Sequence, residues 1–523
     1  MSAEPAGRVL IASNRGPVSF SLGDDGRLIS RRGGGGVATA LSALAGRAEV
    51  LWVCAALNDA DRAAARAAAD GQLDVPLTAD GAAPGGPESA VRMLDIPALV
   101  FDRAYNGVAN STLWFIHHLL FDTPNQPLFG LAFRREWESF RAYNAAFADA
   151  LAEGAGPPRA GARAMVQDYH LTLVPRMLAQ RRPDLAIAHF SHTPWAPPEY
   201  FALLPDDVAR EVLEGILGAD HAGFHAERWA SAFLDCCEAV LGAQVDRAAR
   251  TVRHAGHTTT VGIHALGVDA AQLRDRAAAD DVQVHMAGLA EVAGDRKLIV
   301  RIDRTELSKN IVRGLAAYRE LLITWPQWRG KVTHVAFAYP SRHDLPEYRE
   351  YTASVQRMAR EIVDEFGTDD WDPLVLQVND DYPRSLAAYR LADVLVVNPV
   401  RDGMNLVAKE APLLSDRACA LVLSREAGAA AELAEGALLV NPYDVSATAQ
   451  ALHQALSMNS AERNRRGSLL AQASAACPPQ QWLASQLSAL EAAAKAAPQP
   501  AQPAERRPPW ARRVPGRRAR RAR

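Results

Sequence analysis

The sequence is short of the features that mark secreted, disulfide-bonded and membrane-spanning proteins. Its five cysteines are odd in number and show no CxxC spacing, which argues against a disulfide framework and against a zinc site. Its apolar runs fall well short of the ~20 residues that cross a bilayer. The run at 8–13 is too short for a signal peptide. These absences predict a soluble, cytoplasmic protein with no membrane contact.

Lysine is also scarce, and the basic residues are unevenly distributed. Only five lysines accompany 52 arginines, and two of them, Lys309 and Lys409, lie in motifs described below. The net charge is −3, but residues 506–523 carry nine arginines and no acid, so the rest of the chain carries about −12. An acidic body with a tail of Pro, Ala and Arg predicts a disordered tail and no nucleic-acid partner.

Apolar residues are abundant. Along the chain, short apolar runs typical of buried strands alternate with stretches whose apolar residues recur at helical spacing. At 523 residues and 49% hydrophobic content, the chain is long enough for two or three domains. Strands are predicted at 186–191, 394–397 and 420–424, for example, and helices at 223–237 and 346–366. Such alternation predicts an α/β fold with two doubly wound parallel sheets.

A hinge-like Gly-Val-Asp at 267–269 separates the two series of strands and helices. We therefore expect one domain at 1–266 and a second at 267–478. A closing helix is expected at 479–497, followed by the disordered tail at 498–523.

The most informative stretch reads RDGMNLVAKE, at 401–410, and follows the strand predicted at 394–397. Asp402 is suited to cap a helix, which would leave the next three backbone amides unpaired at the positive end of the helix dipole. Such an end suits a phosphate or sugar hydroxyls. At ~1.5 Å per residue, Glu410 would lie about 12 Å from Asp402 along the helix, roughly the span from a hexose across a diphosphate to a ribose.

Near the N-terminus, a cation and a run of glycines follow the first strand pattern. Arg15 comes just after the run at 8–13, at the carboxyl end where open α/β sheets bind ligands. Four glycines at 33–36 precede a helical stretch, and their lack of Cβ atoms would let backbone amides approach a diphosphate. GxxxxGK is absent, so this is not a P-loop, and a flexible linker is the alternative.

Aromatic, acidic and imidazole side chains recur at positions suited to a sugar pocket. Tyr105 and Trp114 lie on one helix predicted at 103–118, and Asp168 and His192 each follow a strand-like run. Two parallel strand ends would bring Asp168 and His192 to one edge, where they could orient hydroxyls or stabilise developing charge. For each residue taken alone, core packing or an ordinary turn is the alternative.

The second half of the chain carries cations at equivalent strand ends. Arg304 and Lys309 follow the strand at 297–302, and Arg342 follows the strand at 333–338. At a cleft edge they would neutralise the charge that grows on a leaving diphosphate. Any one of these three cations could be a surface charge. Three of them facing the N-terminal half of the chain, which holds Arg15, predict an anion-binding cleft.

In their order along the chain, these motifs resemble the trehalose-6-phosphate synthase family of retaining glycosyltransferases. The resemblance spans about 8–490 and rests on SNR at 13–15, the glycine run, YN...N..LW at 105–114, QDYHL at 167–171, HTPW at 192–195, R....SK at 304–309, RDGMNLVAKE at 401–410 and NPYD at 441–444. It implies a GT-B fold, in which two Rossmann-like domains face each other across a cleft. It also implies glucose transfer from UDP- or GDP-glucose to glucose 6-phosphate, giving α,α-trehalose 6-phosphate, with no metal or other cofactor.

The resemblance further implies a role for each motif residue. The expected catalytic set is Arg304 and Lys309 at the donor diphosphate, with His192 and Asp402 at the donor hexose. On the acceptor side, Arg15 and Arg342 would hold the phosphate, and Trp52, Tyr105, Trp114 and Asp168 would surround the sugar. The other expected donor-binding residues are Gly35, Gly36, Gly403, Met404, Asn405, Leu406, Val407 and, at the ribose, Glu410. Front-face attack, with the leaving phosphate accepting the acceptor's proton, needs no protein nucleophile and no close pair of carboxylates.

Departures from the family's usual motifs keep other functions open. The segment at 304–310 reads RTELSKN where relatives more often have RLDYSKG, Trp195 stands where Phe is common, and the second tryptophan of a WxGW motif is missing after Trp52. Same-fold synthases acting on glycerol phosphate or a cyclitol phosphate are the alternatives. A catalytically silent sugar-phosphate sensor is a third, which retention of Arg304, Lys309 and Glu410 disfavours. We also expect homo-oligomers and a separate phosphatase for the product.

Overall fold

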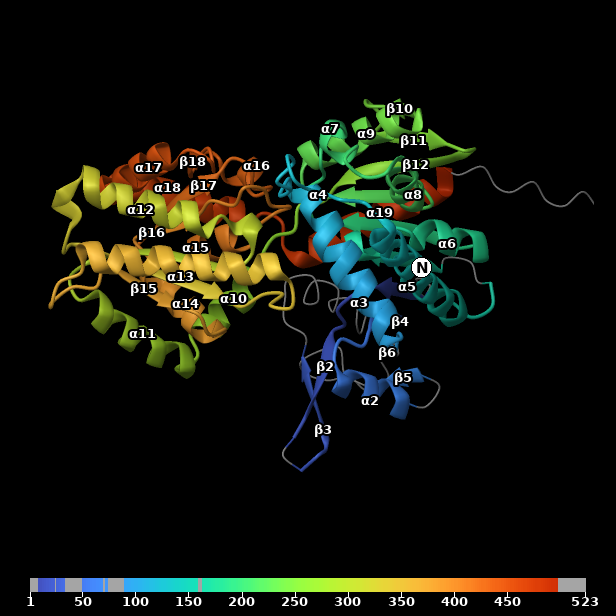
Figure 1. Cartoon of the computed structure of the whole chain (residues 1–523), viewed down its shortest axis with the longest axis horizontal. Helices are drawn as coiled ribbons and strands as arrows, with labels where there is room; N and C mark the ends of the chain where they lie inside the picture. The colour runs from blue at the N-terminus through green and yellow to red at the C-terminus, as the bar shows by residue number, and fades with distance from the viewer. Residues whose placement is uncertain are drawn as a thin grey trace, which may run out of the picture.

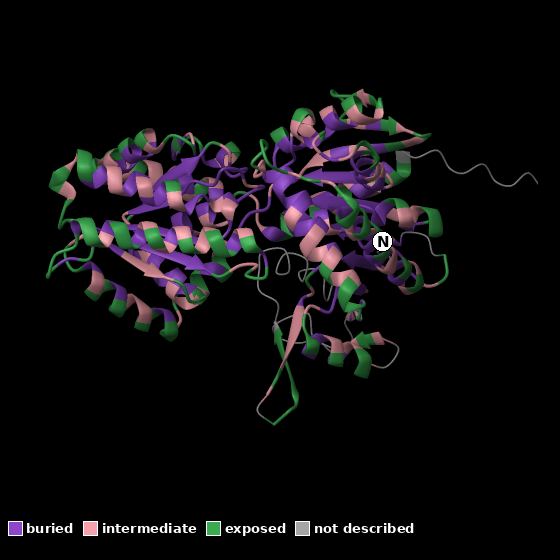
Figure 2. Ribbon diagram, in the orientation of Figure 1, coloured by how far each residue is buried: buried purple, intermediate pink, exposed green. Residues whose placement is uncertain are grey.

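The computed structural model describes residues 8–23, 25–32, 49–68, 71–73, 89–158 and 162–496. They form two lobes that lie side by side in Figure 1, and buried residues run through the sheets of both lobes in Figure 2. The strands of the first lobe all precede residue 264, and those of the second all follow residue 296. The expected domain boundaries at 266/267 and 478/479 stay predictions.

The first lobe is built on a mostly parallel sheet whose strand order reverses at β1. Ten described strands lie in the order β10-β11-β12-β9-β8-β7-β1-β4-β6-β5, with antiparallel pairs at the two edges. They are β1 (Val9–Ala12), β4 (Val50–Ala55), β5 (Gln72–Leu73), β6 (Ser89–Leu94), β7 (Arg163–Gln167), β8 (Ala186–Ser191), β9 (His221–Phe224), β10 (Gln244–Asp246), β11 (Thr251–His254) and β12 (His257–Ile263). Because β4 and β7 extend the sheet in opposite directions from β1, the carboxyl end of β1 is a switch point that suits a ligand.

The second lobe holds a fully parallel sheet in the order β15-β14-β13-β16-β17-β18. Its strands are β13 (Lys297–Arg304), β14 (Val332–Tyr339), β15 (Leu374–Gln377), β16 (Val394–Val397), β17 (Ala420–Ser424) and β18 (Leu438–Val440). The order reverses between β13 and β16, so the loops after these strands again lie at a switch point. The prediction of two doubly wound parallel sheets is confirmed.

Helices cover both faces of each sheet, as the alternating pattern predicts. Those of the first lobe are α2 (Asp59–Ala67), α3 (Ala98–Asp102), a π-helix at Arg103–Leu113, α4 (Trp114–His118), α5 (Leu131–Gly154), α6 (Val174–Arg181), α7 (Pro198–Phe201), α8 (Asp206–Ile216) and α9 (Glu227–Leu241). Those of the second lobe are α10 (Ala270–Ala277), α11 (Asp280–Ala293), α12 (Ile311–Thr324), α13 (Pro346–Phe366), α14 (Tyr382–Leu391), α15 (Val407–Leu414), α16 (Ala430–Leu433), α17 (Val445–Ser457) and α18 (Ser460–Ala475). Among the described helices, none combines the length and the apolar character needed to cross a membrane.

Two elements leave the simple two-lobe plan. The last described helix, α19 (Pro479–Ala496), returns to the first lobe, where it contacts β8, β9 and β12, and Trp482 meets Phe190 edge-on at 5.1 Å between ring centroids. The hairpin of β2 (Val18–Leu22) and β3 (Leu28–Arg32) extends away from the body in Figure 1 and is joined to α2 by a hydrogen bond from Phe20 N to Asp61 Oδ1 at 2.7 Å.

Several predicted elements have the predicted bounds, and others differ. The strands at 186–191, 394–397 and 420–424 and the helix at 346–366 are confirmed to the residue. The helix predicted at 223–237 is wrong at its start, because 221–224 is the buried strand β9 and α9 begins only at Glu227. The helix predicted at 103–118 is present, but most of it is π-helical.

Candidate active site

The loops at the carboxyl ends of the two sheets meet at the junction between the lobes. Arg401 Nη2 donates to the carbonyl oxygen of Trp195 at 3.1 Å, and Trp229 Nε1 donates to the carbonyl oxygen of Gly403 at 2.9 Å. The Arg401 guanidinium also lies over the Trp229 ring, 4.6 Å from its centroid. The RDGMN segment of the second lobe is therefore fixed against the HTPW segment of the first.

Gly403 permits the closest approach between the two lobes. A Cβ atom at this position would overlap the carbonyl oxygen of His192, and a Cβ at Gly428 would overlap the carbonyl oxygen of Gly403. In each case the obstacle is backbone, which cannot rotate away as a side chain can. The glycine of this motif is thus required by packing between the lobes, a role that its sequence pattern does not reveal.

Cations and carboxylates gather beside this contact. Lys309 Nζ lies 2.6 Å from Asp402 Oδ2, and Arg304 Nη1 lies 3.2 Å from Glu306 Oε1. Burial alone would lower the pKa of Lys309, but Asp402 and Glu306 raise it above its usual value. The Arg304 side chain is 55% exposed, so its guanidinium remains accessible to a ligand. The predicted pair of cations is brought together at one edge of the second sheet.

The helix expected to begin at Asp402 begins later. Residues 401–406 form an irregular loop, and α15 starts at Val407 after Leu406, which makes no side-chain capping bond. The first-turn amide of Ala408 instead donates to Asn405 Oδ1, one residue further upstream, at 3.2 Å. The prediction that Asp402 caps the helix is wrong, because its carboxylate is paired with Lys309 instead. The 12 Å helical spacing between Asp402 and Glu410 therefore does not apply.

The residues predicted to bind the acceptor include an aromatic enclosure around Arg342. This residue belongs to the second lobe, yet its Cζ lies 4.1 Å from the Trp114 ring centroid and its Nη2 donates to Tyr169 Oη at 3.1 Å, both in the first lobe. Its Nη1 donates to Tyr348 Oη at 2.6 Å. Tyr105 stacks on His170 with centroids 5.6 Å apart. Arg342, Trp114 and Tyr105 are thus grouped at the junction, as predicted from sequence.

Arg15 and Asp168 follow neighbouring strands of the first sheet. Arg15 is exposed and forms no ion pair with the described residues. Burial, and after it the charges of Arg342 and Arg15, hold the pKa of His170 well below its usual value. Asp168 has φ +73° and accepts from His192 N at 3.1 Å. Burial raises the pKa of Asp168 to about 6, against backbone hydrogen bonds that lower it. Asp168 therefore fixes the backbone at the start of the HTPW segment.

The ring of His192 is occupied by other side chains. Its Nδ1 lies 3.2 Å from His225 Nε2, and its Nε2 lies 3.0 Å from Gln167 Oε1. Burial, followed by the neighbouring histidines, holds the pKa of His192 well below its usual range, so the ring is neutral. For this ring to bind a hexose hydroxyl, as predicted, it would have to share or exchange one of these two hydrogen bonds.

Glu410 lies on the first turn of α15. Its Oε2 accepts from Tyr389 Oη at 3.2 Å. Burial raises the pKa of Glu410 to about 7, so the carboxyl group is partly protonated at neutral pH. Its expected contact with a ribose stays a prediction.

The remaining predicted residues are placed as follows. Gly35 and Gly36 lie outside the described residues. Met404 is 4% exposed and packs in the core of the second lobe, while Leu406 and Val407 are partly buried and pack against that core. Trp52 has a side chain that is 0% exposed, and its Nε1 donates to Ser13 Oγ at 2.7 Å, so its expected place beside the acceptor sugar stays a prediction. Trp52 therefore supports the Arg15 loop from behind.

Four residues of the junction were missed by the sequence predictions. Tyr169 and Tyr348 contact Arg342, Tyr389 contacts Glu410, and Glu306 contacts Arg304. Tyr169 lies within the QDYHL motif and Glu306 within RTELSK, so both motifs contained the signal. Tyr348 and Tyr389 lie on helices, where nothing in the local pattern separates them from core aromatics.

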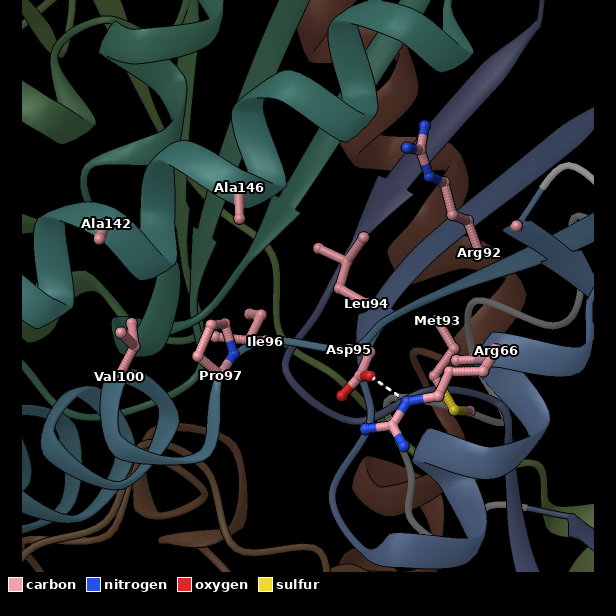
Figure 3. Close-up of a pocket in the computed structure, with 12 residues that line it drawn as sticks. Arg66, Arg92, Met93, Leu94, Asp95, Ile96, Pro97, Val100, Ala142 and Ala146 are labelled. Carbon is pink, nitrogen blue, oxygen red and sulfur yellow. Dashed lines mark hydrogen bonds and ion pairs between the residues drawn. The ribbon is translucent and has the colours of Figure 1, made fainter.

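A separate groove lies at the outer edge of the first lobe. It has a volume of about 450 Å³ and is lined by residues of α2, β6, α3 and α5, among them Arg66 and Asp95, whose ion pair at 2.6 Å is drawn in Figure 3. None of the predicted site residues lines it. Within the described ranges, no group of three or more His, Cys, Asp or Glu side chains is arranged to hold a metal ion, and the absence of a cofactor stays a prediction.

Comparison with known proteins gives consistent matches. The model of glycosyltransferase family 20 matches residues 7–492. The trehalose-6-phosphate synthase of Mycobacterium avium is 34% identical over 92% of this chain and 94% of its own length. The bifunctional trehalose-6-phosphate synthase/phosphatase of Thermoproteus tenax is 33% identical over 88% of this chain, which spans only 60% of that protein's length.

A solved structure agrees with these matches. The α,α-trehalose-phosphate synthase (UDP-forming) of Burkholderia xenovorans, in complex with glucose-6-phosphate, superimposes with a TM-score of 0.79 over 93% of this chain and 100% of its own, at 26% identity. This likeness confirms the predicted GT-B architecture. With the family model matching nearly the whole chain, the protein belongs to glycosyltransferase family 20, together with these trehalose-phosphate synthases.

Proposed function

We propose that the chain transfers glucose, with retention, from UDP- or GDP-glucose to glucose 6-phosphate and so forms α,α-trehalose 6-phosphate. The observation that carries the proposal is the presence of two sets of cations, from two different strand ends, at one junction. Arg304 and Lys309 belong to the end of β13 and the turn after it, and Arg342, enclosed by aromatic rings, lies in the loop after β14. A reaction between a nucleotide sugar and a sugar phosphate brings two phosphorylated ligands together and needs two such sets. The names of the Mycobacterium avium and Burkholderia xenovorans relatives support the same reaction.

The residues would divide the work between the two substrates. Arg304 and Lys309 would bind the donor diphosphate and stabilise the negative charge that grows on it as the glycosidic bond breaks. Arg15 and Arg342 would bind the acceptor phosphate, with Tyr105, Trp114 and Asp168 beside the sugar. The acceptor group takes Arg15 and Trp114 from the first lobe and Arg342 from the second, so binding of the acceptor would favour the closed arrangement of the lobes.

The carboxylates near the donor side would not act as nucleophiles. Asp402 is paired with Lys309, and Glu306 is paired with Arg304, so each is held by a cation. We therefore propose that the acceptor hydroxyl attacks from the face that the diphosphate leaves, and that a leaving phosphate oxygen accepts its proton. The bond from C1 to the diphosphate oxygen breaks, the bond from C1 to the acceptor oxygen forms, and the nucleotide leaves with the proton.

The experiment that tests the proposal is a matrix of donors and acceptors. Release of UDP and of GDP is measured from the two nucleotide-glucoses with glucose 6-phosphate, with glycerol 3-phosphate and with no acceptor. We expect release that depends on glucose 6-phosphate. Release only with glycerol 3-phosphate would move the assignment to that acceptor, and no release with any pair would favour the silent sensor.

The context of the reaction is part of the proposal. We propose that the enzyme works in the cytoplasm, in keeping with its five free cysteines. We also propose that it forms homo-oligomers and that a separate phosphatase removes the phosphate from its product. Size measurement in solution and an assay for free phosphate with trehalose 6-phosphate test these two statements.

A further inference from the structure

Glu306 occupies the centre of the cation cluster, where no role was predicted for it. It lies in the turn between β13 and Lys309, and its side chain is 0% exposed. Its Oε1 faces Arg304 Nη1 at 3.2 Å and accepts from Ser341 Oγ at 2.9 Å. Its Oε2 has no hydrogen-bond partner among the described residues. A buried carboxylate with an unpaired oxygen is costly unless neighbouring charges compensate for its lost hydration.

The compensating charges come from two loops that serve different substrates. Arg304 and Lys309 flank Glu306 in the loop after β13, whereas Arg342 lies next to Ser341 in the loop after β14. Burial would raise the pKa of Glu306, but Arg304, Arg342 and Lys309 outweigh it and lower the pKa to about 2. Glu306 is therefore ionised at every pH at which the enzyme would work.

The other charged groups around Glu306 have partners of their own or are neutral. Asp402 pairs with Lys309 at 2.6 Å, and Asp303 pairs with Arg301 at 2.8 Å. His118, on α4, is neutral because burial lowers its pKa to about 3. The carboxylate of Glu306 is thus the one that contacts the donor-side loop directly and, through Ser341, the acceptor-side loop.

We propose that Glu306 is a positioning residue, an internal counter-ion shared by the donor-side cations Arg304 and Lys309 and the acceptor-side cation Arg342. The inference rests on the proposed function, which places a diphosphate at the first pair and a phosphate at Arg342. The charge of Glu306 keeps three like charges in place before the ligands bind. It also competes with the diphosphate for the same cations, which limits how tightly the nucleotide product is held.

The variant that tests this role is Glu306→Gln, which keeps the size of the side chain and its acceptor for Ser341 but removes the charge. Calorimetry first identifies which of UDP and GDP binds the wild-type protein more tightly. The dissociation constant of that nucleotide is then compared between the wild-type protein and the variant. We expect its dissociation constant to fall about tenfold, because one nearby negative charge is lost. We also expect kcat to fall about tenfold or more without a rise in KM for either substrate, since product release slows and the cations lose their anchor.

Two further variants separate charge from a general effect on folding. Glu306→Asp keeps the charge on a shorter side chain, and its nucleotide affinity should stay within about threefold of the wild-type value. Glu211→Gln is the control, because Glu211 is likewise a carboxylate bound by an arginine, Arg141, and it also accepts from the Trp137 indole N–H. It is less buried than Glu306, with 28% of its side chain exposed, and lies on α8 outside the site. Its nucleotide affinity should not change.

The proposal is overturned if Glu306→Gln folds and binds the nucleotide no more tightly than the wild-type protein. If that variant does not fold, Ser341→Ala decides instead, because it loosens only the link to the Arg342 loop. The KM of the acceptor should then rise while that of the donor does not, and an unchanged acceptor KM rejects the role. Nucleotide binding needs no turnover, so a wild-type protein that binds UDP but transfers no glucose contradicts the proposed function alone.

Discussion

At the scale of single residues, the effect of removing a charged side chain at the junction depends on whether that charge has a partner. Lys309 and Asp402 form a partly buried pair at 2.6 Å, so removing either leaves a poorly hydrated charge without its partner and destabilises the fold. Arg304 differs, because its side chain is 55% exposed and faces Glu306 without any other ion pair among the described residues. The Arg304 charge itself is well hydrated, but it is the nearest cation to the buried Glu306 carboxylate, so its removal has to be followed by turnover and by stability together.

Replacing Arg304 by alanine should lower kcat by roughly 10²- to 10³-fold, the loss seen when one donor to a developing charge is removed. The reason is that the negative charge on the leaving diphosphate grows as the bond breaks, so the contact is stronger in the transition state than with bound substrate. Arg304→Lys, which keeps the charge but not the planar fork, should be intermediate. Steady-state kinetics and a thermal melt are the measurements, and wild-type turnover with unchanged stability would reject the role.

Because Glu410 is buried, its protonation makes the free energy of unfolding depend on pH. Burial raises its pKa from 4.5 to about 7, so between these values the folded protein binds more protons than the unfolded chain. The free energy of unfolding therefore falls as pH rises from about 4.5 to 7, and the loss is complete above pH 7. Glu410→Gln should remove this slope and be more stable than wild type at pH 8, by on the order of 1–2 kcal/mol. Urea unfolding at pH 5 and pH 8 measures the difference, and parallel pH profiles for the two proteins would exclude it.

At the scale of elements, local chemistry decides where the central helix begins. Asp402 and Asn405 are both suitable capping residues, and the sequence alone favours the first because Asp-Gly marks a turn. The structure favours the second, because Lys309, far away in the chain, binds the Asp402 carboxylate. Asn405 also has φ +83°, a left-handed conformation that asparagine tolerates better than most residues.

Substitution at Asn405 should separate these two contributions. Asn405→Ala loses both the cap and the tolerance for positive φ, and should cost about 1–2 kcal/mol of stability. Asn405→Gly loses the cap but keeps the conformational freedom, so it should be less destabilised than the alanine variant. Chemical unfolding compares the two proteins, and an alanine variant at least as stable as the glycine variant would contradict this account of the helix start.

The strands predicted well from sequence are those with a continuous apolar run between turn residues. Strands such as Val394–Val397 read as continuous apolar runs bounded by turn residues, so tertiary context adds nothing to the local signal. The strand at His221–Phe224 was missed because histidine and glycine give it no such signal. The grouping of Arg304, Lys309 and Arg342 was predictable, since parallel strands bring their carboxyl ends to one edge. The pairing of Arg342 with Tyr169 was not, because it depends on how the two lobes meet.

At the scale of the whole molecule, the two lobes are held together by backbone contact as well as by side chains. The Gly403 backbone lies against the His192 carbonyl, Trp229 and Arg401 hydrogen-bond across the junction, and Lys409 Nζ donates to the carbonyl oxygen of Leu266, between the two sheets, at 3.0 Å. The helix α19 then returns to the first lobe. The relative position of the lobes is therefore specified at atomic detail, and the site depends on it.

Gly403→Ala tests this dependence. Its Cβ would overlap the His192 carbonyl oxygen, so the lobes must separate by an ångström or more, and kcat/KM should fall by roughly 10²-fold. The melting of the individual lobes should change little, while small-angle scattering should report a larger radius of gyration. Gly288→Ala is the matched control, because a Cβ there meets nothing within 4 Å. Wild-type activity in Gly403→Ala would show that the closed junction is not needed for catalysis.

The central claim is that glucose passes with retention from a nucleotide donor to a phosphorylated sugar acceptor at this junction. The most direct test incubates the full chain with glucose 6-phosphate and with UDP-glucose or, separately, GDP-glucose, each labelled at C1, and analyses the products by mass and by NMR of the anomeric carbon. The account predicts a disaccharide monophosphate whose labelled anomeric carbon has the α configuration. A β-linked product, or label recovered only as free glucose or unreacted donor, would contradict it.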